Sequence, residues 1–411
     1  MEKYRELVDY LLSSYPNIIR PALGAIPYPY LIPGGFYTQQ WDWDAYFMAN
    51  HLCSRREPKP QYLKYWVDNF LSIFDPNEDT PACVRADEKV IRHPSLILKP
   101  FLARGAVRAM KYNHAEDWGR EVFPKVESTI TRWEKVRRDE PTGLFFWYDS
   151  MMSGADNNPA IGDGPEDVNQ VLSCDVNAYI YTEYLALSEM ASLLGYADKA
   201  ELYQKKAEDL KARIIKHLYH ADENMFWNRR RDGRIVRRNA FSNYIPLTFG
   251  ILDEERGRAL LKDHLMDRKM LSRYGIRSLS QDDPDYNNEC MIVPYSNWQG
   301  PVWVVANYLQ TVALNRYGLK EEAREVTKRL AETLLKDLHN CGSLHENYCA
   351  ECGGGLAPDA DMNKGKEGGF ISWNLLIVDM LEENFPEVFP KAYRPPESQN
   401  LLLSGRGTAF E

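Results

Sequence analysis

Two acidic loops, far apart in the sequence, contain the residue types that hydrolysis of an acetal requires. Residues 153–159 read SGADNNP and include Asp156, and residues 343–348 read SLHENY and include Glu346, about 190 positions later. The reaction needs a carboxylic acid to protonate the leaving oxygen. For inversion it also needs a carboxylate, about 6.5–9.5 Å away, that activates water on the opposite face. Because Asp-Asn-Asn-Pro is also typical of a turn, the hypothesis depends on the two loops meeting in space.

A third segment, 33–47, alternates carboxylates with large aromatic side chains at the start of a predicted helix. It reads PGGFYTQQWDWDAYF and places Asp42 and Asp44 beside two tryptophans and a tyrosine. One aspartate can cap the helix and interact with its dipole, but a cap does not explain the neighbouring rings. Aromatic faces stack on sugars, and carboxylates bind sugar hydroxyls. The segment therefore predicts the wall of a sugar-binding site.

A fourth segment adds aromatic and polar residues of a similar kind. Residues 274–280 (YGIRSLS) are followed by 294–303 (PYSNWQGPVW). Trp298 and Trp303 can both be core residues of the helix that follows, and we expect this for Trp303. Gln299, between a tryptophan and a Gly-Pro pair, is not typical of a core.

Helical periodicity recurs along the chain, whereas sustained alternation of apolar and polar residues does not. Apolar residues fall on one helix face at 203–218 and again at 323–338. The pattern predicts about twelve helices, at residues 3–15, 42–56, 60–74, 96–113, 118–138, 176–194, 196–218, 240–250, 253–266, 298–317, 319–337 and 370–385. Short hairpin strands are predicted at 143–148 and at 225–227 with 235–236. The fold class is therefore all-α, with long loops at 28–44, 143–175, 274–303 and 341–373 that are candidates for carrying chemistry.

The composition is that of a globular protein and argues against several classes of function. The 411 residues are 44% hydrophobic, and their net charge of -9 disfavours a nucleic-acid partner. We find no apolar run long enough for a membrane span and no secretory signal, and we expect a cytoplasmic protein. Seven cysteines are too few, and odd in number, for a disulfide framework. We expect one domain at 1–393, followed by a wrapping or flexible tail at 394–411.

Taken together, these segments resemble glycoside hydrolase family 63 and its relatives, the trehalases. The resemblance rests on five strings in a shared order: Gly34 to Asp44, 153–159, Asp175 to Tyr179, Asn297 to Trp303, and His345 to Tyr348 followed by Phe370 to Trp373. It implies an (α/α)6 barrel that hydrolyses an α-glycosidic bond with inversion and without a cofactor or metal. Compact members of the family include hydrolases of mannosylglycerate and glucosylglycerate, so the resemblance implies a small α-glucoside or α-mannoside as substrate.

The resemblance also implies roles for individual residues. Asp156 would be the general acid and Glu346 the general base. The substrate-binding residues would be Tyr37, Trp41, Trp43, Asp44, Trp298, Gln299, Tyr348 and Trp373. Lys99 and Arg277 are added as cations for an acidic aglycone, because they lie near the aromatic segments.

Two departures from the family pattern concern the site. Lys99 precedes Pro100 where relatives often have glutamine, so a contact at the cleavage point is expected to differ. The loop after Glu346 contains Cys349 and Cys352, and its Glu351 is a rival carboxylate. This CxxC, with His339, Cys341 and His345 nearby, is a weak zinc motif because it lacks a second well-spaced pair.

Two other functions remain as alternatives. A sugar epimerase or isomerase of the same fold would use a histidine as acid and base, and His345 is the candidate. A noncatalytic carbohydrate-binding protein would keep the aromatic wall without needing paired carboxyls. The acidic string Asp282 to Asn287 is a possible calcium ligand set, but its spacing fits no EF-hand.

Overall fold

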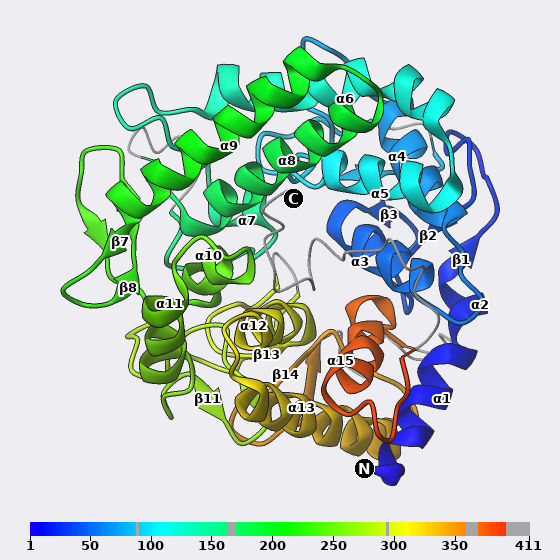
Figure 1. Cartoon of the computed structure of the whole chain (residues 1–411). Helices are drawn as coiled ribbons and strands as arrows, with labels where there is room; N and C mark the ends of the chain where they lie inside the picture. Colours follow the sequence, from blue (N-terminus) through cyan, green and yellow to red (C-terminus); the bar gives the residue numbers. More distant parts are fainter. Residues whose placement is uncertain (88–89, 163–169, 293–295, 358–368, 392–411) are drawn as a thin grey trace.

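The helices form a closed ring in which inner and outer helices alternate along the chain (Figure 1). The computed structural model describes residues 1–87, 90–162, 170–292, 296–357 and 369–391. The inner helices are α3 (Asp42–Cys53), α5 (Leu102–Asn113), α8 (Cys174–Leu193), α10 (Ile245–Thr248), α12 (Val304–Arg316) and α15 (Leu376–Asn384). The outer helices are α1 (Arg5–Ser13), α4 (Gln61–Ser72), α6 (Glu116–Arg137), α9 (Ala197–Leu218), α11 (Glu254–Leu260) and α13 (Lys320–Cys341). This arrangement confirms the predicted all-α class.

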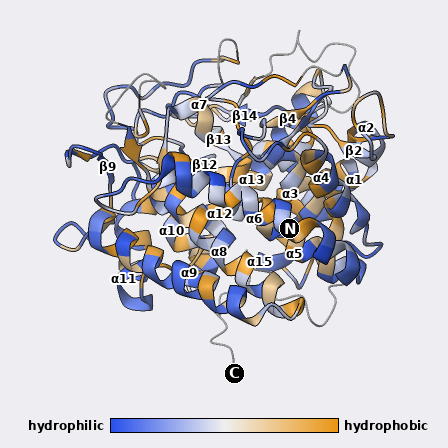
Figure 2. Cartoon of the chain, turned by 90° about the horizontal axis from the view of Figure 1, so that it is seen from above, coloured by the Kyte–Doolittle hydropathy of each residue, from blue (hydrophilic) through white to orange (hydrophobic). Residues whose placement is uncertain are grey.

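Inner and outer helices differ in their residue patterns for a physical reason. An outer helix buries one stripe against the ring, and α9 buries Tyr203, Ala207, Leu210, Ile214 and Leu218 as its periodicity predicts. An inner helix is enclosed on all sides, and every residue of α3 is buried. The exposed faces of α9 and α11 are accordingly hydrophilic (Figure 2). The sequence therefore specifies both layers of the ring.

The ring closes where the last helices meet the first. Helix α15 packs against α3, and α13 packs against α1. One hydrophobic core extends from Tyr4 to Phe389. The predicted tail, 394–411, lies outside the described residues. No helix in the described ranges is long and apolar enough to cross a membrane.

Short turns of helix connect the main elements: η1 (Glu2–Tyr4), α2 (Tyr15–Ile18), α7 (Ser150–Ser153), η2 (Phe241–Tyr244), η3 (Leu261–Leu265) and η4 (Ser372–Leu375). The strands are equally short: β1 (Ile19–Arg20), β2 (Tyr30–Leu31), β3 (Gln40–Trp41), β4 (Cys83–Val84), β5 (Phe146–Trp147), β6 (Val171–Leu172), β7 (Tyr219–His220), β8 (Met225–Phe226), β9 (Asn228–Arg230), β10 (Ile235–Val236), β11 (Leu271–Ser272), β12 (Gly275–Ile276), β13 (Val302–Trp303), β14 (Asn347–Tyr348) and β15 (Gly355–Ala357). When the ring is turned by 90° from the view of Figure 1, β4, β13, β14 and α7 lie toward one end of it (Figure 2). That end carries three of the predicted loops.

Two strand predictions need correction. The sequence suggested that 225–227 pairs with 235–236, but β8 pairs with β7, and β10 pairs with β9. Each of these two pairs is a hairpin with a short connection, 221–224 between β7 and β8 and 231–234 between β9 and β10. Strand β9 also pairs with β6, and β6 pairs with β5. The β9–β10 hairpin is therefore part of a four-stranded sheet in the order β10, β9, β6 and β5.

Three of the helix boundaries that differ from the predicted ones lie near a proline or glycine. The helix predicted from 96 begins at Leu102, after Pro100, and the one predicted from 298 begins at Val304, after Pro301. Helix α13 continues past 337 to Cys341 and ends at Gly342, which has a φ of 66°. The longer α13 brings its last turn beside the Glu346 loop.

Candidate active site

A cavity lies where the first, second and fourth predicted loops and part of the third converge. It encloses about 600 Å³ of empty space, including its open mouth. Nine predicted site residues line it: Tyr37, Trp41, Trp43, Asp44, Lys99, Asp156, Trp298, Glu346 and Trp373. Segments that are hundreds of residues apart in the sequence therefore meet around one space, as the hypothesis requires.

The Asp156 loop is held in place by hydrogen bonds within it and across to the third loop. Asp149 caps α7 by accepting from the Met152 amide at 2.8 Å, and α7 ends at Gly154 with a φ of 86°. The Asp156 Oδ2 atom accepts from the Ser296 amide at 3.0 Å. The adjacent Asn157 Oδ1 accepts from the Trp298 amide at 2.5 Å. These contacts fix both the acid loop and the Trp298 segment at the cavity.

Glu346 comes directly before β14 and is anchored through its main chain. Its amide donates to the Ala357 carbonyl at 2.5 Å, and its carbonyl accepts from Trp373 Nε1 at 3.2 Å. In the side chain, Oε2 accepts from the Tyr37 hydroxyl at 2.9 Å. Glu346 and Asp156 line the same cavity without a hydrogen bond between their carboxyls. Both carboxyls therefore face one cavity while bonding to different partners.

The two aspartates at the start of α3 have different partners. Asp42 accepts from Lys99 Nζ at 3.1 Å and from the Lys99 amide at 2.9 Å, in a buried ion pair. Asp44 Oδ1 instead accepts from the Ser372 hydroxyl at 2.7 Å. Neither side chain caps α3 by bonding an amide two or three residues ahead, although Asp42 Oδ1 accepts from the next amide, that of Trp43. Asp42 is therefore paired with a cation, and Asp44 lines the cavity without a cationic partner among the described residues.

Burial changes the acidity of the cavity carboxyls. It raises the pKa of Asp156 to about 6 and that of Asp44 to about 7, because an ionised carboxylate is poorly solvated there. Burial, together with the charges of Asp44 and Asp156, raises the pKa of Glu346 well above its usual value, while the Tyr37 hydrogen bond opposes this shift. Since the charges of Asp44 and Asp156 act on Glu346, the three carboxyls titrate as a group. A proton is therefore available at the cavity near neutral pH.

Aromatic rings form the floor and sides of the cavity. Trp43 lies 5.8 Å from Trp298 and 5.6 Å from Trp373 between ring centroids. Trp298 also stacks on Trp303 at 4.0 Å. The buried Nε1 atoms of Trp41 and Trp298 have no hydrogen-bond partner in the described part of the chain. Because a buried N–H without a partner is costly, these two groups are suited to donating to oxygen atoms of a ligand.

Three predicted site residues do not line the cavity. Arg277 donates to Glu351 at 2.8 Å, Gln299 accepts from Asn287 at 2.9 Å, and the fully buried Tyr348 hydroxyl accepts from the His345 amide at 3.2 Å. Each of these side chains bonds to a residue outside the cavity lining. Glu351, the rival carboxylate, is half-exposed in its pair with Arg277.

The histidine of the epimerase alternative is also absent from the cavity lining. His345 Nδ1 lies 2.9 Å from Asp337 Oδ2, near the C-terminal end of α13, and the residues that line the cavity include neither of the two. The acidic string considered as a calcium ligand set has protein partners: Asp282 accepts from Lys269 and from Ser280, and Asp285 pairs with Arg238.

Sequence reasoning missed several residues that support the site. Ser372, which donates to Asp44, stands in the predicted 370–373 string but was not singled out. Ser296 contributes through its amide, for which a side-chain pattern gives no signal. The Asp42–Lys99 pair joins residues 57 positions apart. In the sequence, the signal for this pair was the lysine before Pro100, at a position where relatives often have glutamine.

Comparison with known proteins agrees with this geometry. Residues 37–363 match the family model described as mannosylglycerate hydrolase MGH1-like glycoside hydrolase domain. Mannosylglycerate hydrolase MGH1 of Selaginella moellendorffii is 25% identical over 84% of this chain and 80% of its own length. Trehalase of Apis mellifera is 21% identical over 87% of this chain and 63% of its own.

Solved structures show the same fold. GH63 mannosylglycerate hydrolase from Thermus thermophilus, in complex with Tris and D-glycerate, superposes with a TM-score of 0.68 at 16% identity, covering 92% of this chain and 100% of that one. Neutral trehalase Nth1 from Saccharomyces cerevisiae gives 0.65 at 15% identity, covering 88% and 74%. The ring is thus the (α/α)6 barrel expected from the resemblance. With the family model matching most of its length, the chain belongs to the mannosylglycerate hydrolase MGH1-like glycoside hydrolases of family 63, which act on O-glycosyl bonds.

Proposed function

We propose that this glycoside hydrolase cleaves the α-glycosidic bond of a small glycoside with inversion, using Asp156 as general acid and Glu346 as general base. The observation that carries the proposal is the single cavity lined by both carboxyls and by the aromatic residues. Inversion requires two carboxyls with a water molecule between the base and the sugar. The raised pKa of Asp156 supports its role as the acid, and the Tyr37 hydroxyl favours the ionised form of Glu346 that the role of base needs.

In this mechanism Asp156 gives its proton to the glycosidic oxygen as the bond to the anomeric carbon breaks. Ionised Glu346 takes one proton from the attacking water, and the water oxygen forms the new bond to the anomeric carbon. The products are the free sugar and the aglycone alcohol, with the proton moved from Asp156 to Glu346. The Tyr37 hydroxyl, which donates to Glu346, stabilises the ionised form that acts as base.

The remaining cavity residues are proposed to recognise the sugar. Asp44 accepts sugar hydroxyls while Ser372 holds its other oxygen. The Trp41 and Trp298 indoles donate their free N–H groups to hydroxyl oxygens. The aromatic faces of Trp43 and Trp373 cover the apolar face of the ring. Each hydroxyl that meets a buried partner is selected over analogues that lack it.

The substrate class is a proposal for this chain, in which mannosylglycerate comes from the relatives and glucosylglycerate from the family resemblance. Glucosylglycerate and mannosylglycerate are the candidates, and both have an anionic aglycone. Of the two cations proposed for that carboxylate, Lys99 lines the cavity and Arg277 does not. Lys99 is therefore the cation placed to meet an acidic aglycone, although Asp42 shares its charge.

The test is proton NMR of the first-formed sugar during cleavage of a panel of α-glucosides and α-mannosides, with and without a carboxylate on the leaving group. We expect at least one panel member to be cleaved and its β-anomer to appear first. An α-anomer as first product would contradict inversion. Equal rates with and without the carboxylate would contradict the glycerate assignment but leave inversion unaffected.

A further inference from the structure

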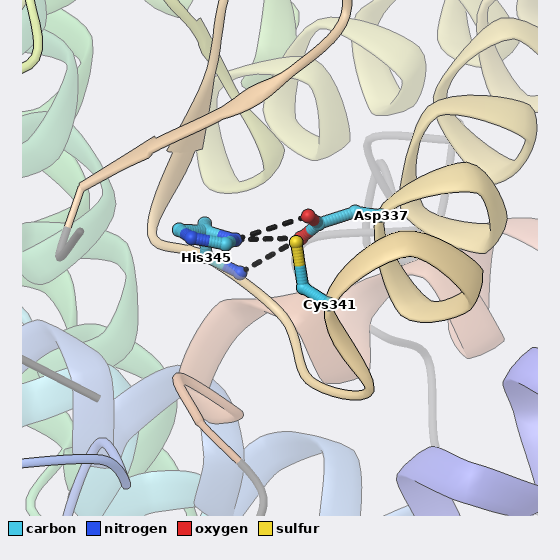
Figure 3. Close-up of side chains that lie close together, drawn as sticks. All are labelled: Asp337, Cys341 and His345. Atoms are coloured by element: carbon cyan, nitrogen blue, oxygen red, sulfur yellow. Dashed lines mark hydrogen bonds and ion pairs between the residues drawn. The ribbon is translucent and has the colours of Figure 1, made fainter. Parts of the chain in front are cut away.

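A second cluster of chemically reactive side chains lies beside the cavity at the C-terminal end of α13. Figure 3 shows Asp337, Cys341 and His345 pointing toward one another. Their ligand atoms all lie within 4.8 Å of one another. Asp337 and His345 are buried, whereas Cys341 is exposed. The proposed hydrolysis makes no use of this cluster.

The local sequence explains why the three side chains meet. Asp337 and Cys341 are four residues apart on α13 and therefore lie on one face of it. Gly342 ends the helix with a φ of 66°, which turns the chain back and brings His345 over the last helical turn. The spacing D-x3-C-x3-H is thus a helix pair followed by a returning loop.

From this arrangement we propose that Asp337, Cys341 and His345 form a site for a soft divalent cation such as Zn²⁺. Carboxylate oxygen, thiolate and imidazole nitrogen are the donors that Zn²⁺ uses in proteins, at about 2.0–2.3 Å from the metal. The His345 Nδ1 to Asp337 Oδ2 distance of 2.9 Å must open slightly, and the thiol must close on both. Because Cys341 is exposed, the fourth position is open to water and the ion has an entry path.

A cation is favoured here electrostatically as well. The last turn of α13 presents carbonyl groups with partial negative charge, which stabilise nearby cations. Asp337 adds a carboxylate to the cluster. On binding, the Cys341 thiol gives its proton to solvent, and a neutral His345 ring would bind the ion through Nδ1 with its proton on Nε2. One proton is released for each ion bound.

This site differs from the zinc motif considered from the sequence. Cys341 and His345 belong to it, but Cys349 and Cys352 do not, and His339 pairs with Glu6 at 2.9 Å. In the described structure the Cys352 amide donates to the Cys349 sulfur at 3.3 Å, away from the Asp337 carboxylate. The cluster with Cys341 and the pair of Cys349 and Cys352 are therefore two alternative metal sites, which mutagenesis distinguishes.

The test is a Co²⁺ titration of the full-length, reduced and chelator-treated protein, followed by visible absorption. We expect a thiolate-to-cobalt charge-transfer band that Zn²⁺ abolishes by displacement. Cys341→Ser should remove this band and weaken Co²⁺ binding by at least about tenfold, because serine is a far poorer ligand for a soft cation. Cys352→Ser, the matched control at another exposed thiol, should keep the band.

Thermal unfolding gives a second measurement that does not depend on the thiol band. Zn²⁺ should raise the melting temperature of the wild type and of Cys352→Ser but not of Cys341→Ser, since a ligand bound only to the folded state stabilises it. No charge-transfer band in the wild type, an unchanged band in Cys341→Ser, or loss of the band only in Cys352→Ser would overturn the proposal.

Discussion

Three buried carboxyls and one phenol set the protonation state of the proposed catalytic centre. Burial and the charges of Asp44 and Asp156 raise the pKa of Glu346, whereas the Tyr37 hydroxyl stabilises its ionised form. Two kinds of neighbour thus act on Glu346 in opposite directions. The acidic limb of the pH–rate profile, where the base becomes protonated, reports their balance.

This balance predicts opposite shifts for two substitutions. Tyr37→Phe removes a hydrogen bond to the ionised base and should move the acidic limb of kcat/KM to higher pH by about half a unit to one unit. Asp44→Asn removes a negative charge and should move it to lower pH by a similar amount, while raising KM. Profiles of kcat/KM against pH for the three proteins decide this. Shifts in the same direction would contradict the assignment of Glu346 as base.

The buried Lys99–Asp42 pair is expected to matter for stability as well as for substrate. Lys99→Met leaves the fully buried Asp42 carboxylate without its cation, which should cost about 3–5 kcal/mol in the free energy of unfolding. Denaturant unfolding measures the loss. Adding Asp42→Asn should recover much of it, because the unpaired charge is then gone. A single variant as stable as the wild type would show that the pair contributes little.

Individual site residues were predictable from the sequence where a side chain stands in a distinctive string. Asp156, Glu346 and the tryptophans of 33–47 belong to that kind, and the structure brings them to one cavity. Arg277 and Gln299 stand in similar strings, yet their side chains turn to Glu351 and Asn287. Which way a loop side chain points depends on long-range partners, and residue type alone does not fix it.

The loop before α3 is fixed by contacts with the segment before η4. The Pro33 carbonyl accepts from the amides of Ile371 and Ser372, both at 2.9 Å. Gly34 has a φ of 97°, and a Cβ there would lie 2.6 Å from the Gly369 carbonyl oxygen. This contact joins the segment of Tyr37 to the segment of Ser372 and Trp373. Both sides of the cavity therefore depend on one close backbone approach.

Gly34→Ala should lower kcat/KM by at least about tenfold, because the clash displaces both segments beyond the roughly 0.5 Å tolerance that catalysis requires. Gly195→Ala is the matched control. It also has a positive φ, 79°, but a Cβ there would meet nothing within 4 Å. The control should lose about 1 kcal/mol of stability from backbone strain and keep its activity. Equal activity losses in the two variants would contradict the proposed role of the contact.

Helices were more predictable than their connections. The stripe of α9 falls where its periodicity places it, since burial of one helix face is a local pattern. The strand partners of β8 and β10 were wrong, because two-residue strands carry almost no pattern of their own. The extension of α13 to Cys341 was missed because the periodic apolar residues stop at Leu338, while the helix ends at Gly342.

The acidic groups of the cavity make the stability of the whole protein depend on pH. Asp44 has a pKa of about 7 when folded, against an ordinary value of 3.8. The folded state therefore holds more protons than the unfolded state between about pH 4 and 7, and stability falls as the pH rises through this window. Asp156, at about 6, acts in the same direction. These two carboxyls therefore lower the stability of the folded state most at alkaline pH.

Asp44→Asn should therefore be more stable than the wild type at pH 8, by on the order of 1–3 kcal/mol in the free energy of unfolding, and this gain should fade toward pH 4. Asp79→Asn is the opposite case, because burial there is outweighed by hydrogen bonds from Arg137 and Arg132 that lower the Asp79 pKa. The stability that the Asp79→Asn variant loses should be largest at neutral pH. Denaturant unfolding across this pH range measures both, and a destabilised Asp44→Asn at pH 8 would contradict the account.

The measurement that most directly tests the paired carboxyls compares two leaving groups in Asp156→Asn and Glu346→Gln. A glycosyl fluoride needs little help from an acid because fluoride departs readily, whereas an alkyl glycoside needs a proton. Asp156→Asn should lose at least about 100-fold in kcat on the glycoside but far less on the fluoride of the same sugar, and Glu346→Gln should lose similar activity on both. Wild-type turnover of the glycoside by either variant, or equal losses on both substrates for Asp156→Asn, would contradict the account.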